Sequence, residues 1–353
     1  KIGFGVVNTH VQDGIVRGSG MLVALNPHAN NSNRLLDTKS GQYLSFKRSV
    51  KSNQIYPNSL MGAMALIRQM YLDANWYAKG NAETKDVSLE ALNNNTGLTQ
   101  FFDAGSKLNA LRADKVGDEF GIQYTIVGGG DEYENIEEIK ATNATFVIPI
   151  NFRKAYSVED QHLTNQIDLS DMRKWNQEPS NLSVLHKNNV PFSITTHKLK
   201  KVTDFTKNIQ KAINYGFDKT AALEALTTIP AKILGKENEI GSLRKGSYAN
   251  FLITSGAIFD SNTIIYENWV QGVKNVVNNM KIKDISGNYT LSINNKNYSL
   301  NISGKASKPT AIIKEGETKL KSKFSYTNNW INLNFKDTLN TENHIRLIGR
   351  VSE

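Results

Sequence analysis

The residues that could carry chemistry in this chain are few and widely spaced. The sequence has six histidines and no cysteine, which excludes thiolate ligands, thiol nucleophiles and disulfides. Asp103 and His197 stand out because each directly follows a short apolar run typical of a buried strand. A carboxylate and an imidazole can both bind a metal and both transfer protons. Asp103 and His197 are therefore the candidate catalytic and metal-binding residues.

Three other histidines have simpler explanations. His10 could stand in for a missing metal ligand, but it lies alone in a loop-like context, and a role outside any metal site is favoured. His162 lies in a polar loop that could reach a site, and a surface position is the favoured interpretation. His186 precedes a lysine at a helix end, where a solvated side chain is usual.

Two further motifs resemble binding sites. Gly128–Gly130 lies between a strand and a helix, as a phosphate-binding loop does. Asp131 and Glu132 would repel an anion there, and no Walker lysine or GxGxxG pattern is present, so turn packing is favoured. The same two carboxylates resemble a general-acid pair, although acidic residues are common in the first turn of a helix. The run Lys198–Lys201 could bind an acidic partner, but a solvated helix start is favoured.

The elements that must position these residues alternate between strand and helix. Strands are predicted at residues 101–105, 122–127, 145–150 and 190–196, and helices at 108–120, 131–140 and 182–187. This alternation indicates an α/β barrel, in which chemistry is placed at the carboxyl ends of the strands. Asp103 and His197 would then offer two ligands at neighbouring strand ends.

The flanking segments differ in character. Residues 3–25 predict two strands joined by a glycine-rich loop, 27–55 are polar and turn-rich, 58–78 predict a helix, and 81–97 predict helix ends and loop. From residue 287 onward, short alternating strands predict an all-β module. This module contains no catalytic motif. A packing or interaction role is expected for it, with sugar or lipid binding as the weaker alternative.

The segment from 217 to 256 carries a family resemblance. It is similar to the C-terminal signature of the amidohydrolase superfamily, in its imidazolonepropionase and dipeptidase-like branch. The matching residues are Ala225-Leu226, Thr228, Pro230-Ala231, Leu234-Gly235, Gly241-Ser242-Leu243, Gly246 and Ala249-Asn250-Phe251-Leu252. The resemblance implies an amidohydrolase-type (β/α)8 TIM-like barrel, incomplete at the N-terminus, with a C-terminal all-β module. The expected divisions are 1–245 for the barrel, 246–282 for a small β-sandwich return segment and 283–353 for the β module.

The resemblance also implies a metal site whose ligands this sequence lacks. The family's first ligand pair, His-x-His, is absent and is expected upstream of Lys1. Asp103-Ala104-Gly105 stands in place of a HAH-like run, and 127–130 in place of an EHG-like run. Thr195-Thr196-His197 stands in place of the family's TSD or TTD. Zinc is expected for the family but not in this chain.

The function implied is an amidohydrolase-family hydrolase subunit or half that acts on C–N bonds, in non-peptide amides or dipeptides. This chain would be metal-poor and would support a catalytic partner barrel, on another chain or in the same precursor. One alternative is an active enzyme whose first ligands precede Lys1. The other is a non-catalytic ligand-binding or structural protein on the same scaffold, so whether the chain is itself an enzyme stays open.

Composition limits the partners and the location. The net charge of +9 comes from lysines spread along the chain, which favours a solvated surface over a nucleic-acid site. No apolar run approaches the length of a membrane span. A small-molecule substrate is compatible with this composition. The absence of cysteine suits a periplasmic or secreted protein, with a cytoplasmic location as the alternative.

Overall fold

The structure is a computed structural model and describes residues 2–293, 295–327, 329–336 and 344–351. Contacts between residues divide the chain into two units. The larger unit comprises residues 2–251 with 269–273, and the smaller comprises 252–268 with 274–353. Within the described ranges, no helix combines the length and apolar character needed to cross a membrane.

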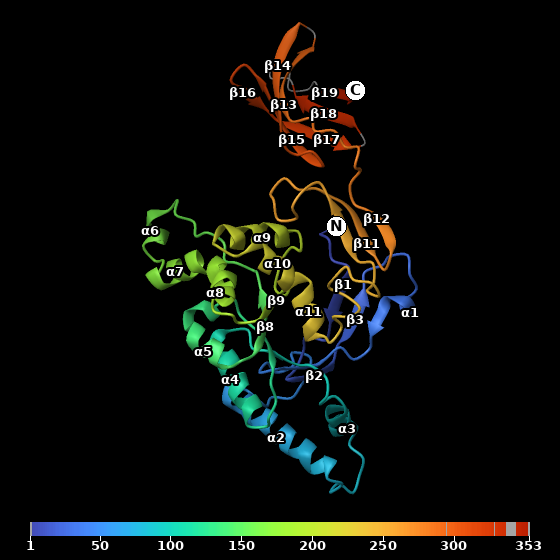
Figure 1. The fold of residues 1–353 in the computed structure, drawn as a ribbon. Helices are drawn as coiled ribbons and strands as arrows, with labels where there is room; N and C mark the ends of the chain where they lie inside the picture. Colours follow the sequence, from blue (N-terminus) through green and yellow to red (C-terminus); the bar gives the residue numbers. More distant parts are fainter. Residues whose placement is uncertain (1, 294, 328, 337–343, 352–353) are drawn as a thin grey trace. The chain divides into compact units, whose positions relative to one another are not determined.

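The larger unit is built around a six-stranded sheet (Figure 1). In spatial order its strands are β2 (Val16–Ser19), β5 (Gln42–Ser45), β6 (Gln100–Asp103), β7 (Thr125–Val127), β8 (Thr145–Pro149) and β9 (Phe192–Thr195). Strands β5 to β9 are parallel, while β2 runs antiparallel to β5. Phe102, Ile126 and Phe146 of this sheet have no exposed surface. The parallel strands end at a common edge, which is where Asp103 and His197 lie.

Helices follow the strands as the barrel pattern requires. They are α2 (Leu60–Ala78), α3 (Val87–Asn94), α4 (Lys107–Asp118), α5 (Ile136–Ala141), α6 (Gln161–Thr164), α7 (Leu169–Gln177), α8 (Asn181–Lys187), α9 (Asp204–Asn214), α10 (Lys219–Leu226) and α11 (Thr228–Ile233). Short 3-10 turns η1 (Glu132–Asn135) and η2 (Glu178–Ser180) precede α5 and α8. Figure 1 shows α4, α5 and α8 following one another along the outside of the sheet.

Local capping explains where several helices begin. Ser59 accepts a hydrogen bond from the backbone N–H of Gly62 at the start of α2, and Asp218 accepts one from Ala221 at the start of α10. In the signature segment Gly241 has φ +85°, and a Cβ there would lie 2.6 Å from the carbonyl oxygen of Thr227. Only glycine meets both conditions without strain.

The N-terminal part corrects two sequence predictions. Residues 3–25 form three strands rather than two: β1 (Val6–Thr9), β2 and β3 (Met21–Ala24). Residues 27–55 are not only turns, because they contain α1 (Asn31–Arg34), β4 (Leu35–Asp37) and the fully buried strand β5. Strands β1, β3 and β4 form a separate sheet. The hydrophobic pattern missed β5 because two of its four residues are polar. Gln42 accepts a hydrogen bond from Asn95 and Ser45 donates one to the carbonyl of Gly14.

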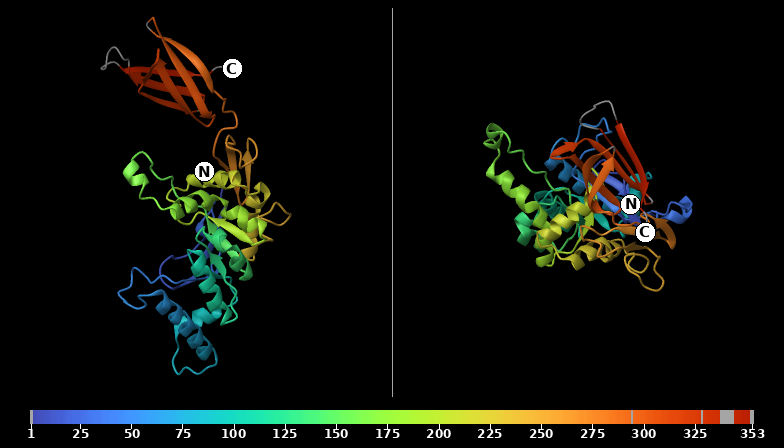
Figure 2. Two further views of the ribbon diagram at one scale, coloured as in Figure 1. Left: turned by 90° about the vertical axis from the view of Figure 1, so that its left-hand side faces the viewer. Right: turned by 90° about the horizontal axis from the view of Figure 1, so that it is seen from above.

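The remaining strands complete the chain. A three-stranded sheet consists of β10 (Phe251–Thr254), β11 (Ile265–Val270) and β12 (Val273–Val276). The C-terminal strands are β13 (Gly287–Ile293), β14 (Lys296–Lys305), β15 (Lys308–Glu315), β16 (Thr318–Leu320), β17 (Ser322–Thr327), β18 (Trp330–Lys336) and β19 (His344–Arg350). They form a four-stranded and a three-stranded antiparallel sheet, orange to red in Figure 2. The two sheets share one core, in which the rings of Tyr298 and Phe335 meet at 5.1 Å. The predicted all-β character of this region is confirmed.

Candidate functional site

The carboxyl edge of the main sheet brings four polar side chains into one electrostatic cluster. His10, Arg17, Asp103 and His197 come from four separate segments, and the charges of Arg17 and Asp103 act on both imidazoles. Asp103 ends β6 and is mostly buried, while both histidines are half-buried. The sequence candidates Asp103 and His197 are therefore brought together. Their strands are not neighbours, however, because β7 and β8 separate β6 from β9.

The centre of this cluster is an ion pair between Arg17 and Asp103. Both terminal nitrogens of Arg17 donate to Oδ2 of Asp103, at 3.1 Å each, and Nε donates to the carbonyl of Gly14. The side chains are 2% and 9% exposed. The register between β2 and β5 shifts at Arg17, between Val16 and Gly18, and such a bulge re-aims the side chain it carries.

His10 also belongs to the cluster, although no feature of the sequence places it beside Asp103. Its ring stacks on Tyr43 at 3.8 Å and 8°, and Tyr43 stacks in turn on Phe101 at 4.7 Å. Nε2 of His10 is buried and has no hydrogen-bond partner among the described residues. Burial, with the positive charge of Arg17 as a smaller cause, lowers the pKa of His10 to about 4. His10 does lie in a loop, directly after β1, but it does not stand alone, because folding stacks it inside the cluster.

His197 lies in a turn directly after β9, and its backbone N–H donates to the hydroxyl of Thr195. Burial lowers the pKa of His197, and the positive charges of Lys198, Lys47 and Arg17 add to the effect, while Asp103 opposes it. Lys198 follows with φ +65°, and its Nζ would lie 3.4 Å from a Cβ added to Gly105. Together with Lys198 and Lys47, the cluster therefore has more positive than negative groups, and its two imidazoles favour the neutral form.

The residues present do not fit a dinuclear metal centre. Across the described ranges, no three His, Asp or Glu side chains come together in a way that could hold a metal ion. The one carboxylate of the cluster already binds the guanidinium of Arg17, which is always charged and offers no lone pair. Glycine occupies the strand-end position at Gly128, and it provides no ligand atom.

The glycine-rich loop after β7 is occupied by the chain's own carboxylate. Oε1 of Glu132 accepts the N–H of Gly129 at 2.6 Å, and Oε2 accepts the N–H of Gly130 and Nδ2 of Asn181. Glu132 has no exposed surface, and burial raises its pKa. A Cβ on Gly128 would meet Oε1 of Glu132 at 2.1 Å. This loop therefore supports the packing interpretation, with Glu132 in the place a phosphate would take.

The other sequence candidates lie apart from the cluster. His162 in α6 and His186 in α8 are exposed, as expected. Asp131 accepts a hydrogen bond from the backbone N–H of Lys107, the first residue of α4. The prediction that Lys198–Lys201 opens a helix is wrong, because α9 begins at Asp204, and the lysines occupy the turn before it.

Sequence reasoning missed Arg17 and Tyr43. The available signal for Arg17 was a charged residue inside the apolar, glycine-rich run from Ile15 to Gly20, where an unpaired arginine would be costly. Tyr43 gave no such signal, because its partner His10 lies 33 positions earlier and becomes its neighbour only in the folded chain.

The parallel strands and alternating helices of the larger unit define an α/β fold with polar side chains at the strand ends, and comparison with known proteins gives its family. Residues 78–285 match the model of the amidohydrolase family, which covers more than half of the chain. The chain belongs to the amidohydrolase family. The fold class and the hydrolase-family assignment predicted from the sequence are confirmed, although the six strands described in the main sheet do not close into a barrel.

A solved structure at a TM-score above 0.6 supports the same fold, and more distant ones also match. An amidohydrolase from Thermotoga maritima MSB8 is 20% identical, with a TM-score of 0.63 over 77% of this chain and 72% of that chain. A Xaa-Pro dipeptidase with bound methionine is 16% identical, with a TM-score of 0.43 over 68% and 55% of the two chains. A putative prolidase from Bifidobacterium longum is 16% identical, with a TM-score of 0.33 over 53% and 58%. No curated protein sequence matches the chain.

Proposed function

We propose that this chain is a metal-poor amidohydrolase barrel, a subunit or half that supports a catalytic partner barrel acting on C–N bonds. The observation that carries the proposal is the ion pair between Arg17 and Asp103. The guanidinium supplies a fixed positive charge beside the strand-end carboxylate, where a metal-dependent relative would place a metal cation. The carboxylate of Asp103 is therefore neutralised by a guanidinium, which cannot activate water as a metal ion does.

The physical reason is the ligand requirement of hydrolysis by metal-activated water. Two divalent cations need several imidazole and carboxylate ligands at about 2.0–2.2 Å from each metal. A cation entering this cluster would have to displace Arg17 from Asp103 and would meet the positive charges of Lys198 and Lys47. Arg17, His10 and Asp103 are therefore assigned a structural role here, with no reaction step passing through them.

A second candidate function is ligand binding without chemistry at the same strand ends. It is favoured by two buried polar atoms, Oδ1 of Asp103 and Nε2 of His10, which have no hydrogen-bond partner in the described part of the chain. Buried polar groups are normally satisfied, so their pairing with a bound molecule would stabilise the fold. A saturable ligand together with hydrolytic inactivity of the full-length assembly would favour this candidate.

Metal content tests the main proposal. Zinc and other divalent metals are measured by ICP-MS on the native assembly and on this chain alone. We expect metal in the assembly and none that is stoichiometric in this chain. As a matched control, the D103N variant should have the same metal content as the unmodified chain.

Two zinc ions per copy of this chain, reduced by D103N, would overturn the proposal. That result would mean that the strand ends of this chain hold the metal ions and that the barrel is itself an enzyme. Binding of a second amidohydrolase barrel can be followed separately by size-exclusion chromatography with light scattering. An assembly whose hydrolytic activity does not depend on this chain would contradict the supporting role.

A further inference from the structure

A cavity of about 200 Å³ lies at the amino end of β9, opposite the end that leads to His197. Active sites of barrel enzymes lie at the carboxyl ends of the strands, so this cavity is separate from the cluster around Asp103. The lining residues come from the segment between α8 and β9 and from α10 and α11: His186, Asn189, Val190, Pro191, Phe192, Ala221, Glu224, Ala225 and Ile229.

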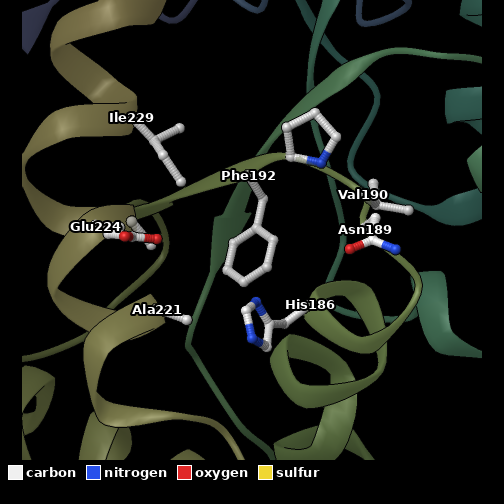
Figure 3. Close-up of a pocket in the computed structure, with 9 residues that line it drawn as sticks. His186, Asn189, Val190, Phe192, Ala221, Glu224 and Ile229 are labelled. Carbon is white, nitrogen blue, oxygen red and sulfur yellow. The ribbon is translucent and has the colours of Figure 1, made fainter.

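Six of the nine residues that line the cavity are apolar. Figure 3 shows the ring of Phe192 between Glu224 and Ala221 of α10 on one side and Val190 and Asn189 on the other. Phe192 is 4% exposed and packs on Phe217 at 5.7 Å between ring centroids. An aromatic or aliphatic group entering the cavity would therefore contact a ring that its neighbours hold in place.

The rim carries three polar groups that can define one end of a ligand. The carboxylate of Glu224 is exposed and has no ion-pair partner among the residues the structure describes. His186 of α8 lies near Phe192, and Asn189 contributes an amide. An unpaired carboxylate over an apolar floor is complementary to a cation with an apolar body.

We propose that this cavity binds a small organic cation, an ammonium on an aryl or alkyl group, with the ammonium at Glu224 and the apolar group on Phe192. The volume is below the roughly 300–1,000 Å³ of drug-sized sites, so the ligand is compact. An anion of the same shape would be repelled by Glu224.

Two probes with the same aromatic body and opposite charges test this site: phenethylammonium and 3-phenylpropionate. Each is titrated into the full chain with labelled isoleucine and alanine methyl groups, and the shifts at Ile229 and Ala221 are followed by NMR. We expect saturable shifts with the cation and at least threefold weaker binding of the anion. The E224Q variant should bind phenethylammonium with roughly threefold to fivefold lower affinity, which is the effect of losing a partly exposed ion pair.

The E138Q variant is the matched control, because Glu138 is an exposed glutamate on α5 outside the cavity. It should leave the affinity unchanged, while A221M should abolish binding by filling the cavity. Because Glu224 is exposed, E224Q decides the question even if A221M does not fold. Absence of saturable shifts, equal affinity for both probes, or an equal loss in E138Q would overturn the proposal.

Discussion

Arg17 places both of its terminal nitrogens on the same oxygen of Asp103, 3.1 Å from each, and leaves the other oxygen of that carboxylate without a hydrogen bond among the described residues. The pair is almost fully removed from solvent. Removing one partner of such a pair leaves an uncompensated buried charge, which costs more than the pair itself contributes. The guanidinium of Arg17 is therefore the cation that neutralises Asp103 in the strand-end cluster.

The first prediction concerns this ion pair. We expect R17M to reduce the free energy of unfolding by about 3–5 kcal/mol, because Asp103 would be left buried and unpaired. The R17M/D103N double variant should recover part of this loss, since no full charge remains at the site. Chemical denaturation that follows the larger unit provides the measurement. In the exposed pair Arg68–Glu119, R68Q should cost at most about 1 kcal/mol. A loss in R17M no larger than in R68Q would show that the pair is not buried in solution.

The second prediction concerns pH and His10, whose pKa of about 4 in the folded state lies below the usual histidine pKa of 6.5. Above pH 6.5 both states hold a neutral imidazole, and the stabilisation is complete. As pH falls from 6.5 towards 4, the unfolded chain binds a proton that the folded chain does not, so stability decreases. His197 contributes with the same sign, because burial lowers its pKa as well.

The measurement is the melting temperature between pH 7.5 and 5 for the unmodified chain and for H10F, which keeps a ring on Tyr43 but cannot titrate. The melting temperature should decrease less steeply with falling pH in H10F than in the unmodified chain. The exposed His162 provides the control, and H162Q should leave the slope unchanged. Identical slopes in all three proteins would contradict the assignment.

The third prediction concerns the buried carboxylate in the glycine-rich loop. A glutamine at position 132 has only one acceptor oxygen, and its amide would face the donor Nδ2 of Asn181. We expect E132Q to lower the free energy of unfolding by about 1–3 kcal/mol, the cost of unsatisfied buried donors. E138Q, on the exposed face of α5, should stay within about 0.5 kcal/mol. Thermal or chemical unfolding distinguishes the two outcomes.

The fourth prediction uses the close approach of Gly128 to Glu132. A methyl group at position 128 would meet Oε1 of Glu132 at 2.1 Å, so the loop or the carboxylate must move. We expect G128A to lower the free energy of unfolding by about 1–3 kcal/mol, as overpacking does. Gly97 is the control, because nothing lies within 4 Å of a Cβ added there. If G97A destabilised as much as G128A, backbone effects would explain the loss.

Much of the architecture could be predicted from local sequence. The helix at 58–78, the strand at 101–105 and the cap at Asp218 were each expected, and they correspond to α2, to β6, which ends at Asp103, and to the start of α10. These elements carry their own signals, which are hydrophobic period, capping side chains and turn glycines. Their strand–helix alternation and the signature segment were sufficient to predict an amidohydrolase-type α/β fold.

Which residues gather at the strand-end site could be seen only in the tertiary structure. Arg17 pairs with Asp103, and His10 stacks on Tyr43, through contacts between residues 86 and 33 positions apart in the sequence. No local pattern encodes such pairs. Strand β5 was missed for the same reason, because its buried polar residues find their partners only after folding. The sequence by itself determined which ligand types are missing from the strand ends. Only the folded chain decided that an arginine pairs with the carboxylate that remains, because burial and long-range contact are properties of the assembled sheet.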